Sequence, residues 1–134
     1  MRAVLVGAVL AILVAAAPTS ASASTGTSLR ITYWEDSAKP ADSLTWTLRC
    51  GPARGTLARP ARACARLATG GVRLLAPLRK NIACTEIYGG PQRARLVGTV
   101  NGRRIWATFS RTNGCEISRW QRISPWLVPP GGVT

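Results

Sequence analysis

The chain has 134 residues and a formal net charge of +13, from 18 Lys and Arg against five Asp and Glu. It contains no histidine, which excludes Ser-His-Asp and Cys-His catalytic arrangements and histidine metal sites. Its carboxylates also lack the sequence context of a catalytic pair, so we expect neither an enzyme nor a cofactor or metal; they are Glu35, Asp36, Asp42, Glu86 and Glu116.

Residues 1–23 have the pattern of a secretory signal peptide. Arg2 provides a positive start, residues 3–17 form an unbroken apolar run, and residues 21–23 are a small-residue cleavage motif. The apolar run is short for a membrane span. We therefore expect a secreted, extracellular protein without membrane association after signal removal. Residues 24–134 then form a single domain, with 24–27 and 129–134 flexible.

Residues 29–34 and 44–50 alternate between apolar and polar side chains, which predicts two β-strands. We expect the apolar face of the second strand to lie on the core. Pro60 suits the first turn of a helix that runs to about Ala68 and stops at Gly70-Gly71. The leucines that follow, Leu74, Leu75 and Leu78, are interpreted as core residues.

Asn101-Gly102 is a strong hairpin signal, because both residues tolerate the positive φ of a tight turn. It predicts paired strands over residues 94–100 and 104–109. A short helix is expected over 116–121. Residues 123–128 are interpreted as a last strand, at a sheet edge because it contains Pro125. These elements give a mixed α and β domain of about five strands and two short helices.

The four cysteines, Cys50, Cys64, Cys84 and Cys115, favour two disulfides in an exported protein. Three pairings remain open on the sequence alone. The absence of a CxxC pair argues against zinc. The five tryptophans are interpreted as core or dimer-interface residues rather than a ligand platform; they are Trp34, Trp46, Trp106, Trp120 and Trp126.

Several motifs occur in an order that is specific as a set. A first strand is followed by residues 45–51 ending at the first cysteine, and an Ala-rich helix carries the second cysteine. Then come Cys84-Thr85-Glu86-Ile87-Tyr88, Val100-Asn101-Gly102 and Asn113-Gly114-Cys115-Glu116. From about Ser28 to Leu127 the chain thereby resembles the Streptomyces subtilisin inhibitor family. The resemblance implies an α+β fold with an antiparallel sheet, the sequential disulfides Cys50–Cys64 and Cys84–Cys115, and a homodimer packed through the sheets.

The resemblance also implies a function, the inhibition of an extracellular serine protease. The reactive bond would lie between Glu86 and Ile87, with Cys84, Thr85 and Tyr88 as the other protease-contacting residues. Asn113 matches the position that supports this loop in the family. A protease binds an extended segment by backbone hydrogen bonds and side-chain pockets, and a loop held rigid by a disulfide loses little entropy on binding.

The chain departs from the family at two places. Glu86 replaces the methionine or lysine that is common there, and a buried carboxylate without a cationic partner is costly. We therefore expect repulsion by trypsin-like pockets, so that the target is a subtilisin-like or glutamate-selective protease. Gly89-Gly90-Pro91 replaces Asp-Pro after the tyrosine, and we expect the added glycine to loosen the loop.

The high positive charge supports an alternative function, a secreted basic binding module for anionic polymers or surfaces. The arginines are scattered along the sequence and form no run. We therefore interpret them as a solvated basic surface and expect no nucleic-acid partner.

Overall fold

A computed structural model describes residue 16 and residues 26–132. The elements follow the chain in the order β1 (Ser28–Trp34), β2 (Ser43–Arg49), α1 (Pro60–Gly70), the 3-10 helix η1 (Gly71–Leu75), β3 (Arg93–Val100), β4 (Arg103–Phe109) and α2 (Gly114–Ile123). The predicted signal peptide, apart from residue 16, lies outside the described residues. Within the described part, no helix has the length and apolar character needed to cross a membrane.

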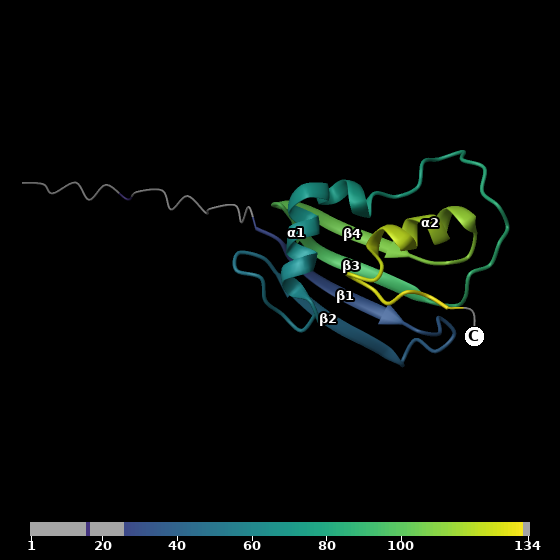
Figure 1. Cartoon of the computed structure of the whole chain (residues 1–134), viewed down its shortest axis with the longest axis horizontal. Helices are drawn as coiled ribbons and strands as arrows, with labels where there is room; N and C mark the ends of the chain where they lie inside the picture. The colour runs from purple at the N-terminus through teal and green to yellow at the C-terminus, as the bar shows by residue number, and fades with distance from the viewer. Residues whose placement is uncertain (1–15, 17–25, 133–134) are drawn as a thin grey trace, which may run out of the picture.

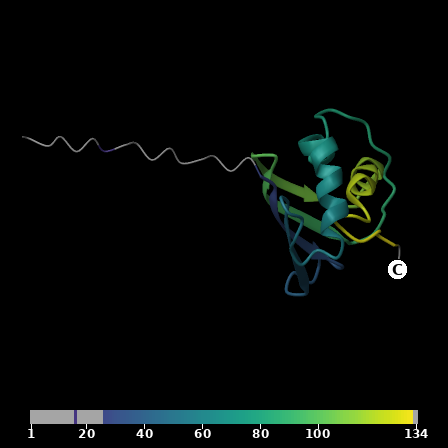
Figure 2. The same ribbon diagram turned by 60° about the vertical axis from the view of Figure 1, so that its left-hand side comes forward.

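The strands form one antiparallel sheet in the order β2-β1-β3-β4. Both helices cover the same face of this sheet, as the turned view in Figure 2 shows, and the opposite face has no covering layer among the described residues. The predicted α+β class, antiparallel sheet, two helices and two disulfides are confirmed. The sheet has four strands rather than about five.

The missing strand is the one predicted over residues 123–128, and that prediction is wrong. Helix α2 continues to Ile123, and a turn follows it. The amides of Ser124 and Leu127 donate to the carbonyls of Trp120 and Ile123, so these two amides are satisfied within the turn rather than by a neighbouring strand. The apolar residues that suggested a strand, Trp126, Leu127 and Val128, are instead buried in the core.

The predicted hairpin is present, and β3 and β4 meet at a turn in which Asn101 has φ 49° and Gly102 has φ 78°. The Asn101 side chain also donates to the carbonyl of Leu67 at 3.2 Å, which connects the turn to α1. The fold therefore uses Asn101 twice, once for its positive φ and once for its amide.

Helix α1 begins at Pro60 and ends at Gly70, and its C-cap residue Gly71 has a φ of 56°, which favours glycine. Its buried residues Ala63 and Leu67 are four apart, so they lie on one face against the sheet. The Cys50–Cys64 disulfide joins α1 to the end of β2, with 5.6 Å between the Cα atoms.

The core lies between the sheet and the helices. Alternate residues of β1 and β3 point into it and are almost completely buried, and Trp120 and Ile123 reach it from α2. Strand β2 meets the core only at its C-terminal half. Leu48 is fully buried and Trp46 packs against the core, whereas Leu44 is 57% exposed, so the expected apolar face of β2 lies on the core except at Leu44.

Candidate functional site

A long connection without regular secondary structure, residues 76–92, joins η1 to β3 and passes along the edge of the molecule beside α2 (Figure 1). It contains the predicted reactive segment, Cys84–Tyr88. Within that segment Cys84 is half-buried and Glu86 is exposed. Ile87 and Tyr88 are 62% and 59% exposed, which is unusual for large apolar side chains. The structure thus presents Glu86, Ile87 and Tyr88 to solvent.

The N-terminal side of this segment is attached to the start of α2. The Cys84–Cys115 disulfide places the two Cα atoms 5.4 Å apart. Beside it, the amide of Gly114 donates to the carbonyl oxygen of Thr85 at 2.9 Å. Gly114 has no space for a side chain, since an added Cβ would overlap Thr85 Oγ1. A side chain where α2 begins would therefore have to displace the Thr85 hydroxyl.

The C-terminal side is attached to the residues just before α2. The amide of Gly89 donates to the carbonyl oxygen of Arg111 at 2.7 Å, and Arg111 Nη1 donates back to the carbonyl oxygen of Gly89. Gly89 also packs against Ile117 of α2, where a Cβ would lie 2.8 Å from Ile117 Cδ1. Because both sides of the segment are attached to residues 111–117, the exposed part spans two fixed points on one support.

The two glycines after Tyr88 have a structural role that the sequence did not reveal. Both are buried, and Gly90 has φ +130°, a backbone conformation that other residues rarely adopt. A Cβ on Gly90 would also overlap Gln92 Oε1. The glycines let the chain pass close to Arg111 and α2. The expected loosening of the loop stays a prediction. The structure shows that both glycines pack closely against their neighbours, Gly89 against Ile117 and Gly90 against Gln92.

A hydrogen-bonded chain extends from this support into the sheet. Arg111 Nη1 donates to Gln92 Oε1 at 3.0 Å, and Gln92 Nε2 donates to Glu35 Oε1 at 3.0 Å. Tyr33 donates its hydroxyl to the other oxygen of Glu35. The bond from Tyr33, followed by that from Gln92, lowers the pKa of Glu35. Burial, with the bond to Glu35 next, raises the pKa of Tyr33.

Asn113, which the sequence predicted as loop support, occupies the N-cap of α2. Its Oδ1 accepts the amide of Glu116 at 2.9 Å, which satisfies one of the free amides at the helix start. This bond fixes the turn that carries Gly114. The support of the reactive segment by Asn113 stays a prediction.

Sequence reasoning missed two arginines that fix the ends of the 76–92 connection. Arg111 fixes the C-terminal end, as described above. Buried Arg119 fixes the beginning, where it donates to the carbonyls of Ala76 and Leu75 and also contacts Glu116 at 3.5 Å. No motif marks either residue. The sequence signal that could have pointed to them was their position: Arg111 comes just after β4, and Arg119 is on the helix that carries Cys115.

This arrangement can hold an extended peptide in a fixed shape, but it does not assemble catalytic groups. One carboxylate lies in the segment and one on α2, and they have different surroundings: Glu86 is exposed, and Glu116 pairs with Arg119. In residue 16 and residues 26–132, no group of three or more His, Cys, Asp or Glu could hold a metal ion.

Comparison with known proteins identifies the family of this chain. Residues 23–113 match the family model described as subtilisin inhibitor-like. The chain therefore belongs to the subtilisin inhibitor-like family, whose members are protease inhibitors and not enzymes. It is similar to a solved structure, that of Streptomyces caespitosus sermetstatin in complex with Bacillus licheniformis subtilisin. The two are 25% identical, the match covers 75% of this chain and 98% of the other, and the TM-score is 0.49. No curated protein matches the chain.

Proposed function

We propose that the protein is a secreted inhibitor of an extracellular serine protease, and that it presents Cys84–Tyr88 to the enzyme with Glu86–Ile87 as the reactive bond. One observation carries the proposal. Glu86, Ile87 and Tyr88 are exposed, while Thr85 before them and Gly89 after them are hydrogen-bonded to the same support. Membership of an inhibitor family supports it as well.

The two attachments explain how such a segment resists turnover. A free peptide loses conformational entropy when a protease orders it, and this segment is already ordered. Hydrolysis of the Glu86–Ile87 bond would leave one new end fixed through Thr85 and the other through Gly89. The ends then stay near each other, so the bond can re-form and neither product leaves.

Glu86 would set the specificity. Its carboxylate is exposed in the free protein and would enter the specificity pocket of the enzyme. A pocket that holds an aspartate, as in trypsin-like enzymes, repels it, because two carboxylates of like charge would be buried together without a cationic partner. A broad, solvated subtilisin-like pocket accepts it at reduced affinity, and a glutamate-selective pocket suits it best.

The test is an inhibition panel of subtilisin-like, glutamate-selective and trypsin-like proteases. The Glu86→Lys variant should gain inhibition of trypsin. Asp42→Lys is the matched control, because it changes the charge equally at an exposed residue of the β1–β2 loop. Intact-mass analysis of the complexes should show one cut, between Glu86 and Ile87. If no enzyme is inhibited and Glu86→Lys gains nothing against trypsin, the reactive bond is assigned wrongly.

Two further expectations remain proposals and have simple measurements. Secretion with cleavage after Ala23 predicts a mature protein whose N-terminal sequence starts at Ser24. The homodimer packed through the sheets predicts twice the monomer mass in sedimentation at micromolar concentration.

A further inference from the structure

A hollow of about 390 Å³ lies between β2, the start of α1 and the segment that follows α2. Its volume is within the range of small-molecule pockets, about 300 to 1,000 Å³. Apart from two arginines, every residue that lines it is apolar, and the largest side chains are those of Trp46, Leu57 and Trp126. The Trp126 Nε1 already donates to the carbonyl of Arg122 at 2.9 Å, so this ring offers a ligand only apolar surface.

The charged rim of this hollow comes from α1 and the residue before it. Arg59 and Arg62 line the hollow, and the guanidinium of Arg66 lies 5.6 Å from the ring centroid of Trp126. The three arginines are spaced three and four residues apart, so they follow one face of the helix. Helix α1 contains no acidic residue, and among the described residues no carboxylate lines the hollow. The apolar wall therefore ends at a row of positive charge.

The edge of the sheet next to this hollow is already occupied by the chain itself. Strand β2 is an outer strand, but the amide of Leu57 donates to the carbonyl of Thr47 at 3.1 Å. The amide of Thr47 donates to Thr56 Oγ1 at 2.9 Å. A peptide that bound as an added strand would find these backbone groups in use. A ligand of the hollow must therefore be held by its apolar body and its charge.

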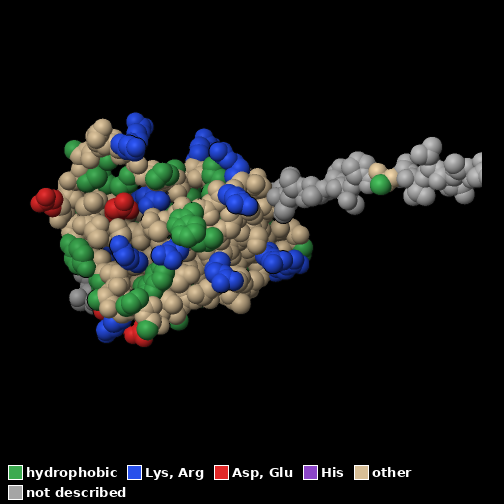
Figure 3. Space-filling model, turned by 180° about the vertical axis from the view of Figure 1, so that it is seen from behind, with side chains coloured by type: hydrophobic (Ala, Val, Ile, Leu, Met, Phe, Trp, Pro, Cys, Tyr) green, Lys and Arg blue, Asp and Glu red, His purple; other side chains and the backbone are tan. Residues whose placement is uncertain are grey.

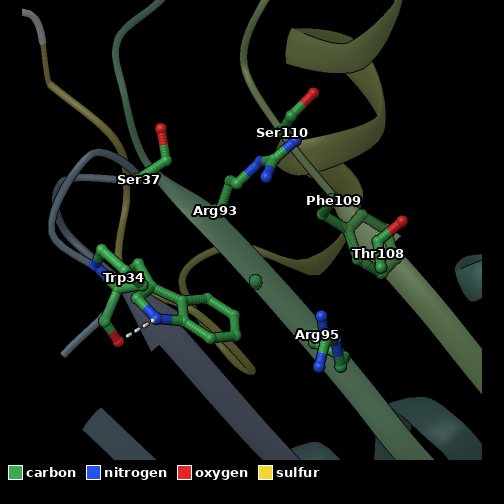
Figure 4. Close-up of a pocket in the computed structure, with 9 residues that line it drawn as sticks. Trp34, Ser37, Arg93, Arg95, Thr108, Phe109 and Ser110 are labelled. Atoms are coloured by element: carbon green, nitrogen blue, oxygen red, sulfur yellow. Dashed lines mark hydrogen bonds between the residues drawn. The ribbon is translucent and has the colours of Figure 1, made fainter. Parts of the chain in front are cut away.

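A second hollow, of about 310 Å³, opens beside Trp34 and β3, where Figure 4 shows Arg93 and Arg95 on the strand. The strand registers place five arginines on the helix-free face of the sheet, which Figure 3 shows: Arg30, Arg49, Arg93, Arg95 and Arg104. The proposed homodimer would pack through this face and cover it. The hollow beside α1 lies on the opposite side of the sheet, with Trp46 packed against the core, and would stay accessible in such a dimer.

We propose that the hollow beside α1 binds a medium-chain fatty acid, with the carboxylate at Arg59 and Arg62 and the hydrocarbon chain against Trp46 and Trp126. Charge complementarity at one end of an apolar hollow carries the proposal. A guanidinium group binds a carboxylate with two parallel hydrogen bonds, which fixes the head of the ligand. Burial of the chain removes apolar surface from water on both the ligand and the protein.

This hollow and the proposed reactive segment lie at opposite ends of α2. The segment is attached to Gly114 and Cys115 at the start of the helix, whereas residues 125–129 of the hollow follow its end. Helix α2 has ten residues, so its ends are about 15 Å apart. We therefore expect the fatty acid to leave protease inhibition unchanged, and the two proposals can fail separately.

The test measures binding of decanoate to the mature chain by isothermal titration calorimetry, at concentrations below micelle formation. The double variant Arg59→Gln/Arg62→Gln should weaken decanoate binding about tenfold or more and change the binding of neutral decanol less than about twofold. The control Arg73→Gln/Arg79→Gln removes the same charge from exposed positions outside the hollow and should change neither by more than about twofold.

The hydrocarbon chain is tested separately. Affinity should rise up to about fourfold for each methylene group added between hexanoate and decanoate, which corresponds to about 0.8 kcal/mol. Ala58→Trp places a large side chain at an exposed residue that lines the hollow, so it should fill the hollow and abolish decanoate binding. Ala53→Trp, at an exposed residue of the same loop outside the hollow, should leave binding unchanged.

Three results would overturn the proposal. The first is no binding of decanoate, or equal affinity for decanoate and acetate, which would mean that the apolar wall holds no ligand. The second is an equal loss in the two arginine double variants, which would mean that only net charge matters. The third is binding of anionic phospholipid vesicles without binding of monomeric decanoate, which would indicate a membrane surface. Circular dichroism confirms that each variant is folded.

Discussion

The backbone amide of Gly114 donates to the carbonyl oxygen of Thr85, and the same glycine leaves no room for a Cβ beside Thr85 Oγ1. This contact joins the first residue of α2 to the residue before Glu86. Next to it, the Cys84–Cys115 disulfide makes the same connection covalently. The start of α2 and the proposed reactive segment therefore behave as one packed unit, and changes in the helix are expected to reach the segment.

Gly114→Ala should displace Thr85 and weaken inhibition without unfolding the protein. The added methyl group would overlap Thr85 Oγ1, and overpacking of this kind costs about 1 to 3 kcal/mol. We expect the inhibition constant to rise about tenfold or more, since 1.4 kcal/mol corresponds to a factor of ten. Inhibition kinetics and a thermal melt measure the two effects.

Gly132→Ala is the matched control, because a Cβ there meets no atom within 4 Å. The double variant Gly114→Ala/Thr85→Ala removes the group that the methyl would strike, so it should recover part of the lost inhibition. Equal inhibition by Gly114→Ala and the unchanged protein would show that the position of Thr85 does not control binding.

Arg111→Met should convert lasting inhibition into temporary inhibition. All hydrogen bonds that Arg111 donates from its side chain come from Nη1, which reaches Gly89, Gln92 and the carbonyl of Gly132. Methionine keeps the apolar stem and removes the donor, and hydrogen bonds to charged groups contribute about 1.5 to 3 kcal/mol. The Ile87 end then keeps only the backbone bond from Gly89 to the carbonyl of Arg111, so it separates more easily after hydrolysis. Incubation with protease should show faster loss of inhibitor by mass spectrometry.

Arg111→Lys distinguishes positioning from bulk packing. A lysine nitrogen can reach some of the same acceptors, so this variant should restore part of the resistance to hydrolysis. Arg73→Met, at an exposed residue of η1, should leave the rate of cleavage unchanged. A rate that is unaffected in Arg111→Met would mean that the Gly89 attachment plays no part in retention.

The sequence predicted the elements whose signals are local and missed those that depend on tertiary contacts. The alternation of β1 and the Asn101-Gly102 turn act through neighbouring residues, so these elements are confirmed. Residues 123–128 are apolar enough to suggest a strand. In the fold they form the end of α2 and a turn, and their large apolar side chains are buried in the core. The exposure of Leu44 likewise depends on tertiary packing, which no local pattern encodes.

The candidate site likewise contains residues that the sequence marks and residues that only tertiary contacts reveal. Cys84 and Glu86–Tyr88 could be found in the sequence because the cysteine and the order of motifs mark them. Arg111 could not, because it is one of many arginines and its partners are backbone carbonyls at Gly89 and Gly132. The gathering of arginines on one face of the sheet could not be predicted for a related reason. These arginines are scattered in the sequence, and only the strand pairing brings them together.

Glu35 should contribute stability that disappears in acid. Its pKa is lowered in the folded protein, chiefly by the hydrogen bond from Tyr33 and then by that from Gln92. The unfolded chain therefore binds the proton more readily, and stability rises with pH through this titration. The contribution is complete above the ordinary glutamate pKa of about 4.3 and is lost as the pH falls through the lower folded value. Urea unfolding between pH 3 and pH 7 measures it.

Glu35→Gln provides the comparison. Glutamine has similar size but does not titrate, so the difference in unfolding free energy between the two proteins should shrink as the pH falls. Asp42→Asn, at an exposed position without a hydrogen-bonded network of this kind, controls for the general effect of removing a carboxylate. A difference that stays constant with pH would show that the Tyr33–Glu35 bond is not linked to folding.

Removing each disulfide in turn should distinguish effects on stability from effects on inhibition. Cys50→Ala/Cys64→Ala releases α1 from β2, far along the chain from the reactive segment, whereas Cys84→Ala/Cys115→Ala releases the segment itself. The bridges close sequence separations of 14 and 31 residues, for which the chain-entropy estimate is about 3 and 4 kcal/mol. Both variants should therefore melt at lower temperature.

Inhibition should distinguish them. Below its melting temperature the Cys50/Cys64 variant keeps Thr85 and Gly89 attached to residues 111–117, so its inhibition constant should stay within about threefold of the unchanged protein. The Cys84/Cys115 variant retains only the hydrogen bonds, so the segment must be ordered on binding and inhibition should weaken by a hundredfold or more, on the order of 3 kcal/mol. Equal losses at equal fractions folded would mean that the Cys84–Cys115 bridge acts only through global stability, and the two-point attachment would then not explain inhibition.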